Sequence, residues 1–380
     1  MPWESRTVEE QRKEFIIAAK ESKNFSALCR EYGITRKTGY KWIARAEETD
    51  DLSDRSHARK SIANKTNINT EQAILSLRKE NPEWGGKTLR KVLENQGYKD
   101  LPCVKTFNNI LKRNGCIEPE ESSKRKAFVR FEKEQCNEMW QTDFKGDFLL
   151  RDGTRCYPLD IMDDHSRFLI KIAPKHNMQG VIDSFRESFC EYGLPKSILS
   201  DNGLTFRGLH GGYTSFEKWL MDYDVLPIHG RVMHPQTQGK IERLHRTMKA
   251  ELLKHQSFSN LEEANQALQK WRNKYNTIRP HEAIGMKCPA EVYVPSKRKY
   301  TDRIEKYEYG GLFHVIKVNS WGYVRFGNWQ VYLSETMIGE YIEFRPNPLG
   351  DSFIACYRNF KIAEFSTETG KLLNRKISRL

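Results

Sequence analysis

The sequence lacks the features of a protein that enters or crosses a membrane. Its 380 residues contain no run approaching the roughly 18 to 20 consecutive apolar residues of a membrane-spanning helix. The N-terminal stretch MPWESRTVEEQRKEFI carries acidic residues and no apolar segment, so the pattern of a secretory signal is missing as well. These absences predict a protein of the cytosol with no membrane partner.

Paired cysteines are also missing. The eight cysteines are scattered along the chain, and no two of them form a C-x-x-C pair. In a chain of this length, that distribution favours buried thiols in a reducing compartment over disulfides or a zinc site.

Acidic residues are outnumbered by basic ones. Lysine and arginine together number 63 against 50 acidic residues, which gives a net charge of +13 and a pI near 9.2. A basic balance favours a polyanionic partner such as nucleic acid. The length exceeds that of one ordinary hydrophobic core, so two or three domains are expected.

Residues 1–48 carry the pattern of a helix-turn-helix DNA-binding domain. Apolar residues recur with helical spacing over 8–20, a second helix begins at the N-cap residue Ser26 and ends at Gly33, and a third begins at Thr35. In such a domain the last helix enters the major groove. The candidate DNA contacts on it are Arg36, Lys37, Tyr40, Lys41 and Arg45. The plainer alternative is a three-helix bundle with a basic outer face.

A second helix-turn-helix-like module is predicted after a polar linker at 49–67. Residues 68–116 contain three further helical patterns, and the last of them, CVKTFNNILKRNGCI, is again basic. Two such modules on one chain would cover a longer DNA site than either alone. The candidate DNA contacts of the second are Lys105, Thr106, Asn108, Asn109, Lys112 and Arg113. A charged linker at 117–136 leads into the next domain.

Residues 137–296 change to an α/β pattern. Strand-like segments begin with NEMWQTDFKGDFLL, RDGT forms a turn, two more strands flank the polar DDHS, and a helix ending at Gly193 precedes the strand in LPKSILSDNG. Three hairpin-linked strands followed by helix, strand and helix describe a ribonuclease H-like core. The mixed sheet of such a core places the middle of the first strand beside the carboxyl end of the fourth.

Asp143 and Asp201 lie on those two strands. Asp143 is inside an apolar strand, where a buried carboxylate needs a cation or hydrogen-bond donors. Asp201 ends the apolar strand SILS and precedes Asn202 and Gly203, the strongest short signal for a hairpin turn. Asp201 is therefore either a turn residue or a carboxylate presented at a strand end.

A third carboxylate lies on the helix predicted within HPQTQGKIERLHRTMKAELLKH, where Glu242, Arg246 and Lys249 share one face. Two aspartates and a glutamate are hard oxygen ligands that suit Mg²⁺ or Mn²⁺. Two such ions would stabilise both the attacking and the leaving oxygen of a phosphoryl displacement. Arg246 and Lys249 would then hold DNA phosphates. Each carboxylate alone has a plain structural alternative, and only their combination favours a metal site.

The blocks WQTDFKG, LSDNG and HPQTQGKIERLHRTMKAEL resemble the D, D and E motifs of bacterial insertion-sequence DDE transposases, which are relatives of retroviral integrases. MPWE, CREYGITRKTGYKW, YPLDIMDDHSRF and YNTIRPHEAIGMKCPAEVY resemble the same group, so the resemblance covers nearly the whole chain. It implies that Asp143, Asp201 and Glu242 are the metal-binding catalytic triad, with probably two ions per active site, and that Arg246 and Lys249 contact DNA.

The sequence departs from this family at two points. Forty residues separate Asp201 from Glu242, more than the family's usual spacing, and the excess falls in the Gly-rich segment 207–215. There is also no His-His-Cys-Cys zinc module, so the two helix-turn-helix units take its place.

Other polar residues near the motif blocks have open roles. One of Asp160, Asp163 and Asp164 could substitute as a metal ligand, but turn and cap chemistry with Arg167 is the favoured interpretation. Two histidines are interpreted as core or loop residues, because the mechanism needs no histidine base: His234 and His281.

After a linker at 297–311, residues 312–380 contain short alternating segments separated by turn residues, which predicts a small antiparallel β-barrel. The resemblance implies an SH3-like module. DNA-backbone binding, subunit bridging and a purely structural role stay open for it.

Together these features predict a cytoplasmic DNA transposase. It would bind the terminal inverted repeats of its element, hydrolyse a phosphodiester to expose a 3′-OH, and join that hydroxyl to target DNA. Cutting two ends in concert predicts a homodimer or larger assembly on double-stranded DNA. Two rival functions remain: a catalytically inactive DNA-binding regulator, and a ribonuclease H-like nuclease without strand transfer.

Overall fold

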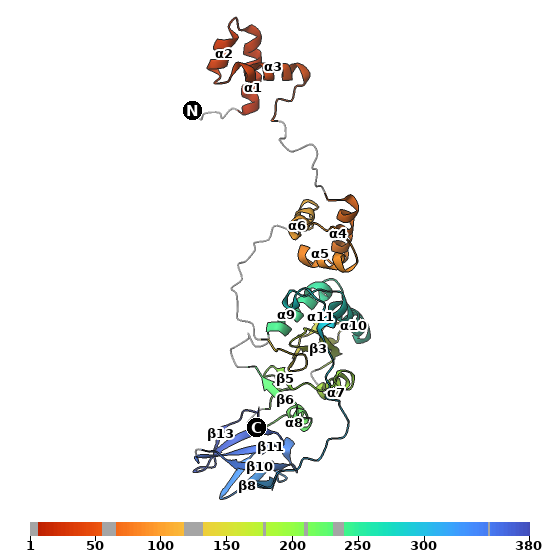
Figure 1. Cartoon of the computed structure of the whole chain (residues 1–380), viewed down its shortest axis with the longest axis vertical. Coiled ribbons are helices and arrows are strands. Elements are labelled where there is room, and N and C mark those ends of the chain that lie inside the picture. The colour runs from red at the N-terminus through yellow and green to blue at the C-terminus, as the bar shows by residue number, and fades with distance from the viewer. Residues whose placement is uncertain are drawn as a thin grey trace. The chain divides into compact units, whose positions relative to one another are not determined.

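The computed structural model describes residues 7–54, 66–117, 132–177, 180–208, 212–230, 239–348 and 350–380 (Figure 1). The chain divides into two compact units, residues 1–65 and 66–380, and each is described by itself. Most of both predicted linkers at 49–67 and 117–136, together with His234 and the middle of 207–215, lie outside the described residues. Within these ranges, no helix has the length and apolar character that a bilayer crossing demands.

The first unit is a three-helix bundle, as predicted. Its helices are α1 (Val8–Glu21), α2 (Phe25–Glu31) and α3 (Arg36–Glu48). The N-cap of α2 is Asn24, whose side chain accepts a hydrogen bond from the Ala27 amide, so the prediction of Ser26 at this position was wrong. Asn caps a helix as well as Ser does, and here it lies two residues earlier. Gly33 forms the turn with φ +65°.

The packed core of the first unit extends beyond α3. Leu52 is only 3% exposed and packs with Phe15, Cys29 and Trp42. Arg12 donates to the Leu52 carbonyl oxygen over 2.6 Å and pairs with Asp54. The chain therefore stays attached to the bundle for several residues after the last helix ends.

The second unit begins with another trihelical module, consisting of α4 (Ile68–Glu80), α5 (Gly86–Asn95) and α6 (Val104–Arg113). Apolar residues of all three helices and Trp84 form its core. Each of the three helices predicted for this stretch is present.

A mixed six-stranded sheet follows. Its strands are β1 (Trp140–Phe144), β2 (Phe148–Leu149), β3 (Arg155–Asp163), β4 (Leu169–Lys175), β5 (Ser197–Ser200) and β6 (Leu226–His229). The order is β2-β3-β1-β5-β6, and β4 pairs with β3. β1 is antiparallel to β3 and parallel to β5, and β5 is parallel to β6. This is the ribonuclease H-like topology that the sequence predicts.

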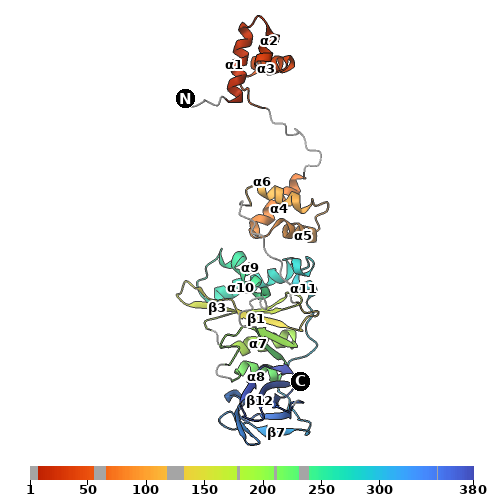
Figure 2. The same ribbon diagram turned by 90° about the vertical axis from the view of Figure 1, so that its left-hand side faces the viewer.

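Helices cover both faces of this sheet (Figure 2). On one face, aromatic residues of α7 (Val181–Tyr192) and α8 (Ser215–Asp222) pack on Trp140, Leu159 and Ile161. On the other face, α9 (Gly239–Met248) and α10 (Leu261–Thr277) pack on the alternate residues, among them Met162 and Ile172. Successive strand residues point to opposite faces, which is why β3 can serve both layers.

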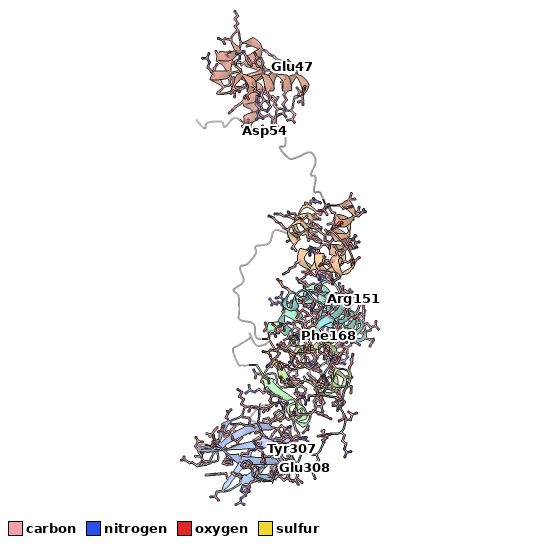
Figure 3. The ribbon with its side chains drawn as sticks, viewed as in Figure 1. Glu47, Asp54, Arg151, Phe168, Tyr307 and Glu308 are labelled. Atoms are coloured by element: carbon pink, nitrogen blue, oxygen red, sulfur yellow. The ribbon has the colours of Figure 1, made fainter. Side chains whose placement is uncertain are left out.

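Three shorter helices follow α9 and α10 along the chain. α9 continues directly into a π-helix, η2 (Lys249–Leu253), and α10 is followed by a 3₁₀ turn, η3 (Glu282–Ile284), and by α11 (Pro289–Val292). Tyr293, which follows α11, stacks on Phe168 (labelled in Figure 3), and the ring centroids are 4.4 Å apart. This stack anchors the chain after α11 to the turn between β3 and β4.

The C-terminal region is all-β, as predicted. The strands are β7 (His314–Lys317), β8 (Tyr323–Phe326), β9 (Trp329–Tyr332), β10 (Tyr341–Pro346), β11 (Ser352–Tyr357), β12 (Phe360–Ser366), β13 (Leu372–Asn374) and β14 (Ser378–Arg379). Six of them form an antiparallel sheet, β8 and β9 form a separate hairpin, and a 3₁₀ turn, η4 (Glu335–Met337), follows β9. The apolar residues of these strands form a hydrophobic cluster that also includes Tyr213 and Met221 from the preceding domain.

Candidate active site

Asp143 lies near the end of β1, directly opposite Asp160 of β3. Its side chain is only 20% exposed. Burial raises the pKa of Asp143 to about 6; His245 opposes this rise, while the charges of Asp201 and Asp160 add to it. A strand interior with its apolar neighbours therefore holds a carboxyl group whose ionised form is poorly solvated.

Asp201 follows the last residue of β5. The Asp201 carboxylate accepts a hydrogen bond from the Gly203 amide over 3.0 Å, as in an Asx turn. Neither Asn202 nor Gly203 has a positive φ, so the hairpin alternative with its two left-handed residues does not apply. A Cβ on Gly203 would lie 3.0 Å from the Asp201 carboxylate, so the glycine makes room for that carboxylate.

The parallel pairing of β1 with β5 brings these two carboxylates together. The register aligns Gln141 with Leu199, two residues before Asp143 and Asp201 respectively. The charge of Asp201 adds to the rise in the pKa of Asp143 that burial causes. Two carboxylates that destabilise one another suit a divalent cation with a preference for oxygen ligands, so the donor set fits Mg²⁺ or Mn²⁺.

Glu242 lies in the first turn of α9, and its side chain faces solvent. The opposite face of α9 is buried through Ile241, Leu244 and Met248, as the sequence predicts. Within the described residues, no three carboxylate, histidine or cysteine side chains are close enough together to hold a metal ion. The structure thus brings Asp143 and Asp201 together and leaves Glu242 outside a closed three-ligand cluster.

His245 is a residue of this site that sequence analysis missed. Its Nε2 atom lies 2.9 Å from the Asp160 carboxylate, without hydrogen-bond alignment, and its Nδ1 atom lies 4.0 Å from Asp143. Asp160 is fully buried, and burial raises its pKa while His245 opposes the rise. The signal was available, because His245 is three residues after Glu242 and therefore lies on an adjacent part of the same helix.

The other two acids of β3 and its turn are structural, as the favoured interpretation held. Asp163 caps the turn, accepting from the backbone amides of Asn137 and Ser166. Asp164 accepts from Gln141 over 2.7 Å and from Lys240 over 2.6 Å. Arg167 donates to the Asp164 carbonyl oxygen, and it pairs with Glu132 over 2.8 Å. Their bonds leave neither acid available as a metal ligand.

Basic side chains are present on the elements that carry the carboxylates. Arg246 and Lys249 are exposed on α9 and at the start of η2. Burial and the nearby charge of Lys249 lower the pKa of Lys145, which follows β1, while the charge of Asp160 opposes this fall. Exposed cations of this kind favour a polyanionic partner.

The helices predicted to contact DNA present most of the expected side chains to solvent. On α3, Arg36, Lys37, Tyr40 and Lys41 are exposed, whereas Arg45 is buried with its guanidinium 5.2 Å from the Trp42 ring centre. Arg45 therefore belongs to the packing of the bundle.

On α6 the exposed residues are Lys105, Asn108, Asn109, Lys112 and Arg113. Thr106 is half-buried and its hydroxyl contacts the Cys103 thiol over 3.4 Å. Arg113 pairs with Glu71 of α4. Most of this basic surface of α6 is thus open to a polyanion.

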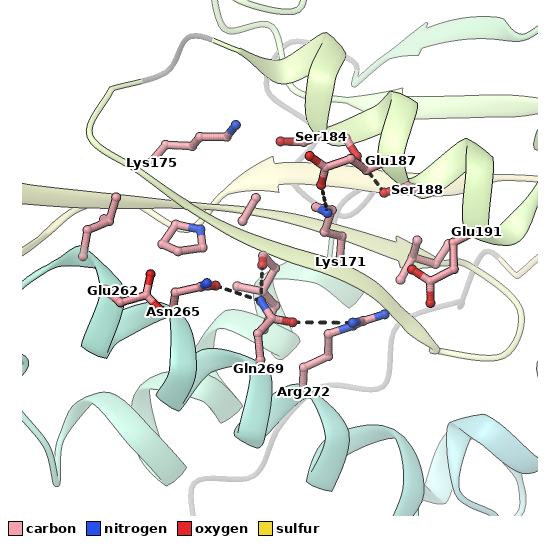
Figure 4. Close-up of a pocket in the computed structure, with 15 residues that line it drawn as sticks. Lys171, Lys175, Ser184, Glu187, Ser188, Glu191, Glu262, Asn265, Gln269 and Arg272 are labelled. Carbon is pink, nitrogen blue, oxygen red and sulfur yellow. Dashed lines mark hydrogen bonds and ion pairs between the residues drawn. The ribbon is translucent and has the colours of Figure 1, made fainter. Parts of the chain in front are cut away.

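A groove of about 530 Å³ lies elsewhere, between β4, α7 and α10 (Figure 4). Side chains of α10 cover the free edge of β4: Gln269 donates to the Ile172 carbonyl oxygen over 2.7 Å, and Arg272 donates to that of Leu169 over 2.9 Å. None of its lining residues belongs to β1, the end of β5 or α9. The groove is therefore separate from the carboxylate pair.

The family models that match the chain agree with this layout. Two integrase core domain models match residues 133–235 and 223–289. A helix-turn-helix domain model matches residues 11–61, and a homeodomain-like model matches residues 38–111. Together the integrase matches cover Asp143, Asp201 and Glu242.

Two bacterial insertion-element proteins are similar to part of the chain. An uncharacterised 39.2 kDa protein of insertion element IS476 from Xanthomonas euvesicatoria is 29% identical over 157 residues, which are 41% of this chain and 44% of that protein. An uncharacterised 31.7 kDa protein of IS407 from Burkholderia multivorans is 27% identical over 157 residues, 41% of this chain and 54% of that protein. The chain thus spans about half the length of the curated relatives it matches.

Among solved structures, the HTLV-2 integrase catalytic core domain in complex with magnesium is similar. It is 19% identical with a TM-score of 0.32, and the match covers 42% of this chain and 97% of that one.

Proposed function

We propose that this chain, which belongs to the integrase-like superfamily of bacterial insertion-element DDE transposases, is a DNA transposase. It would cleave the ends of its element and join them to target DNA. The observation that carries this proposal is the proximity of Asp143 and Asp201 at the ends of the adjacent central strands β1 and β5, where the charge of Asp201 adds to the rise in the pKa of Asp143. An ion pair or a turn residue would not need this arrangement.

Asp143, Asp201 and Glu242 would hold divalent metal, Mg²⁺ or Mn²⁺, as two ions per active site. The ions would supply Lewis-acid stabilisation of the attacking and leaving oxygens of a phosphodiester. The chain's own residues do the rest: β1 and β5 fix the two aspartates, α9 presents Glu242 toward solvent, and His245 places its Nδ1 atom 4.0 Å from Asp143. A 3′-OH freed by hydrolysis would then attack target DNA at the same site.

The helical modules would bind the terminal inverted repeats. Their exposed basic helices α3 and α6 have the size and charge of recognition helices. Arg246 and Lys249 would contact phosphates beside the scissile bond, since phosphate contacts position DNA without reading its sequence. Two ends cut in concert require two active sites, so the protein would act in the bacterial cytosol as a homodimer or larger assembly on DNA.

An assay of joining tests this function. The protein is incubated with Mg²⁺, a labelled element end and a target plasmid, beside Asp201→Asn and the control Asp183→Asn on the exposed face of α7. We expect joined products from the native protein and the control, and none from Asp201→Asn, because an amide is a weak metal ligand. Cleavage without joining would indicate a nuclease, and binding alone a regulator. Full joining by Asp201→Asn would contradict the assigned site.

A further inference from the structure

The segment between Asp201 and α8 folds back on itself. A Cβ added to Gly208 would collide with the Gly212 carbonyl group and lie 3.1 Å from the Tyr213 Cα atom. Only glycine permits backbones to approach this closely. The two ends of the Gly-rich insertion are therefore held together, immediately before α8 begins.

Tyr213 fastens this segment to the C-terminal β-domain. Its hydroxyl donates to the Ile362 carbonyl oxygen over 2.6 Å, and its amide donates to the Ser334 hydroxyl over 2.9 Å. The Thr336 hydroxyl donates to the Tyr213 carbonyl oxygen over 2.9 Å, and the Arg375 guanidinium lies 5.1 Å from its ring centre. The tyrosine is buried within the hydrophobic cluster of that domain.

Glu217 continues the connection inside α8. It is 3% exposed, and a buried carboxylate is stable only when donors surround it. One oxygen accepts from the Thr214 amide over 2.7 Å and from the Gly208 amide over 3.3 Å. The other oxygen is 2.8 Å from His229 Nε2. Glu217 thus ties both ends of the insertion to β6.

His229 carries the connection to the strand that presents Asp201. Its Nδ1 atom is 3.2 Å from the Ser200 hydroxyl, and Ser200 is the last residue of β5. The Gly230 amide donates to the Ser200 carbonyl oxygen over 3.0 Å, and the Asn202 side chain donates to the Gly230 carbonyl oxygen over 2.8 Å. Residues on both sides of Asp201 are therefore fixed by the end of β6.

We propose that Glu217 and His229 are positioning residues for Asp201, and that Gly208 and residues 212–214 make the placement of this carboxylate depend on the C-terminal β-domain. The connection runs from Ile362 and Ser334 through Tyr213, Glu217 and His229 to Ser200. The effect of this connection on metal-dependent cleavage rests on the proposed function. The hydrogen bonds that form the connection do not depend on it.

The hydrogen bonds decide the position of Asp201 because the surrounding apolar contacts have no fixed direction. Packing of α8 on the sheet excludes water but tolerates small shifts. A hydrogen bond weakens steeply when its angle falls below about 120°, so the chain of bonds selects one placement.

Three variants of the full-length protein test the coupling. His229→Leu removes the bonds to Ser200 and Glu217, His229→Gln retains an amide donor and acceptor, and Tyr213→Phe removes only the bond to Ile362. The matched control is Tyr307→Phe in the linker before β7 (Tyr307 is labelled in Figure 3), where the lost hydroxyl donates to Asn359 of the β-domain over 3.1 Å at an exposed site.

Amide hydrogen exchange without metal is the first measurement. We expect exchange at Gly203 and Gly230 to rise by at least about tenfold in His229→Leu and Tyr213→Phe, because these amides donate to Asp201 and Ser200. His229→Gln should restore most of the protection, and Tyr307→Phe should leave it unchanged. Unaltered protection in Tyr213→Phe, or an equal rise in Tyr307→Phe, overturns the inference.

The Mg²⁺ concentration for half-maximal end cleavage is the second measurement. It should rise about tenfold in His229→Leu and Tyr213→Phe, as when a residue that orients a metal ligand is lost. Normal Mg²⁺ dependence in both variants overturns the inference and leaves the proposed function intact. Absence of cleavage by the native protein overturns the proposed function, and the exchange result then still decides the geometry.

Discussion

The carboxyl group of Asp143 is held where its ionised form is disfavoured. Burial and the charge of Asp201 raise its pKa to about 6, while His245 at 4.0 Å acts in the opposite direction. A solvent-exposed aspartate would ionise without this cost. The burial of Asp143 therefore favours a functional role in which the carboxylate is shielded from water. Perturbed pKa values of this kind are typical of functional sites, although ion-pair networks also produce them.

His281 supplies a second buried titratable group with a consequence for stability. Its ring lies edge-on to Tyr275 at 4.5 Å, and its Nε2 atom has no hydrogen-bond partner among the described residues. Burial, with help from the charge of Arg279, lowers the pKa of His281 to about 3. The folded protein therefore keeps this imidazole neutral at pH values where an exposed histidine is protonated.

We expect the free energy of unfolding to fall as the pH drops below about 6.5. His281 then binds a proton in the unfolded chain but stays neutral in the folded protein. At pH 5 the loss from this residue is about 2 kcal/mol relative to pH 7.5. Urea unfolding of the native protein and of His281→Gln at both pH values measures it, with His176→Gln, an exposed histidine, as control. Equal pH dependence in the native protein and His281→Gln would refute this account.

At the scale of secondary-structure elements, much of the fold follows from local pattern. Helical periodicity predicted α1, strand-like composition predicted β1, β3, β4 and β5, and the helix before β5 predicted that β5 pairs in parallel. These signals are local, because residues two to four positions apart make up one face of a strand or helix. The positions of Asp143 and Asp201 could therefore be predicted as well.

Contacts between distant segments could not be predicted in the same way. Tyr213 and Ile362 are 149 residues apart, and no periodicity links them. The burial of Arg45 depends on Trp42 and the fold of the whole bundle. One part of the Asp201 connection was readable: Thr214 and Glu217 have the spacing of a capping box, which marks the start of α8.

The glycine of α3 illustrates packing between helices. A Cβ at Gly39 would lie 2.9 Å from both Cys29 Sγ and Phe25 Cζ, and 3.0 Å from Phe15 Cζ. All three atoms belong to the packed interior of the first unit. Gly39 therefore allows α3 to approach α1 and α2 closely.

Gly39→Ala should destabilise the first unit by about 1 to 2 kcal/mol. Overpacking costs about 1 to 3 kcal/mol and outweighs the gain of up to about 1 kcal/mol in helix propensity. Amide exchange of residues 7–54 in the full-length protein measures the change. Ala44→Ser on the exposed side of the same helix is the control, with an expected effect of at most about 0.5 kcal/mol. A stabilised or unchanged Gly39→Ala protein would show that the interior has room for the methyl group.

At the scale of the second unit, the β-domain and the sheet domain share polar contacts as well as apolar ones. Asp222 at the end of α8 is buried and accepts a hydrogen bond from the Tyr357 hydroxyl over 2.6 Å. Lys218 is 2.9 Å from the same carboxylate, and Arg358 is 3.4 Å away. The end of α8 that follows the Asp201 connection is thus fixed to the β-domain by a charged cluster.

Asp222→Ala should lower the free energy of unfolding by about 1 to 3 kcal/mol, because it leaves the buried Tyr357 hydroxyl without its acceptor and removes the carboxylate beside Arg358, whereas Lys218 keeps its ion pair with Glu340 over 2.8 Å. Urea unfolding followed by tryptophan fluorescence measures the shift. Asp183→Ala on α7 is the matched control: Asp183 forms an exposed pair with Arg186 over 2.8 Å, which should contribute at most about 1 kcal/mol. If both variants unfolded at the same urea concentration, the Asp222 cluster would not help to hold the β-domain, and the dependence of Asp201 on this domain would then rest on Tyr213.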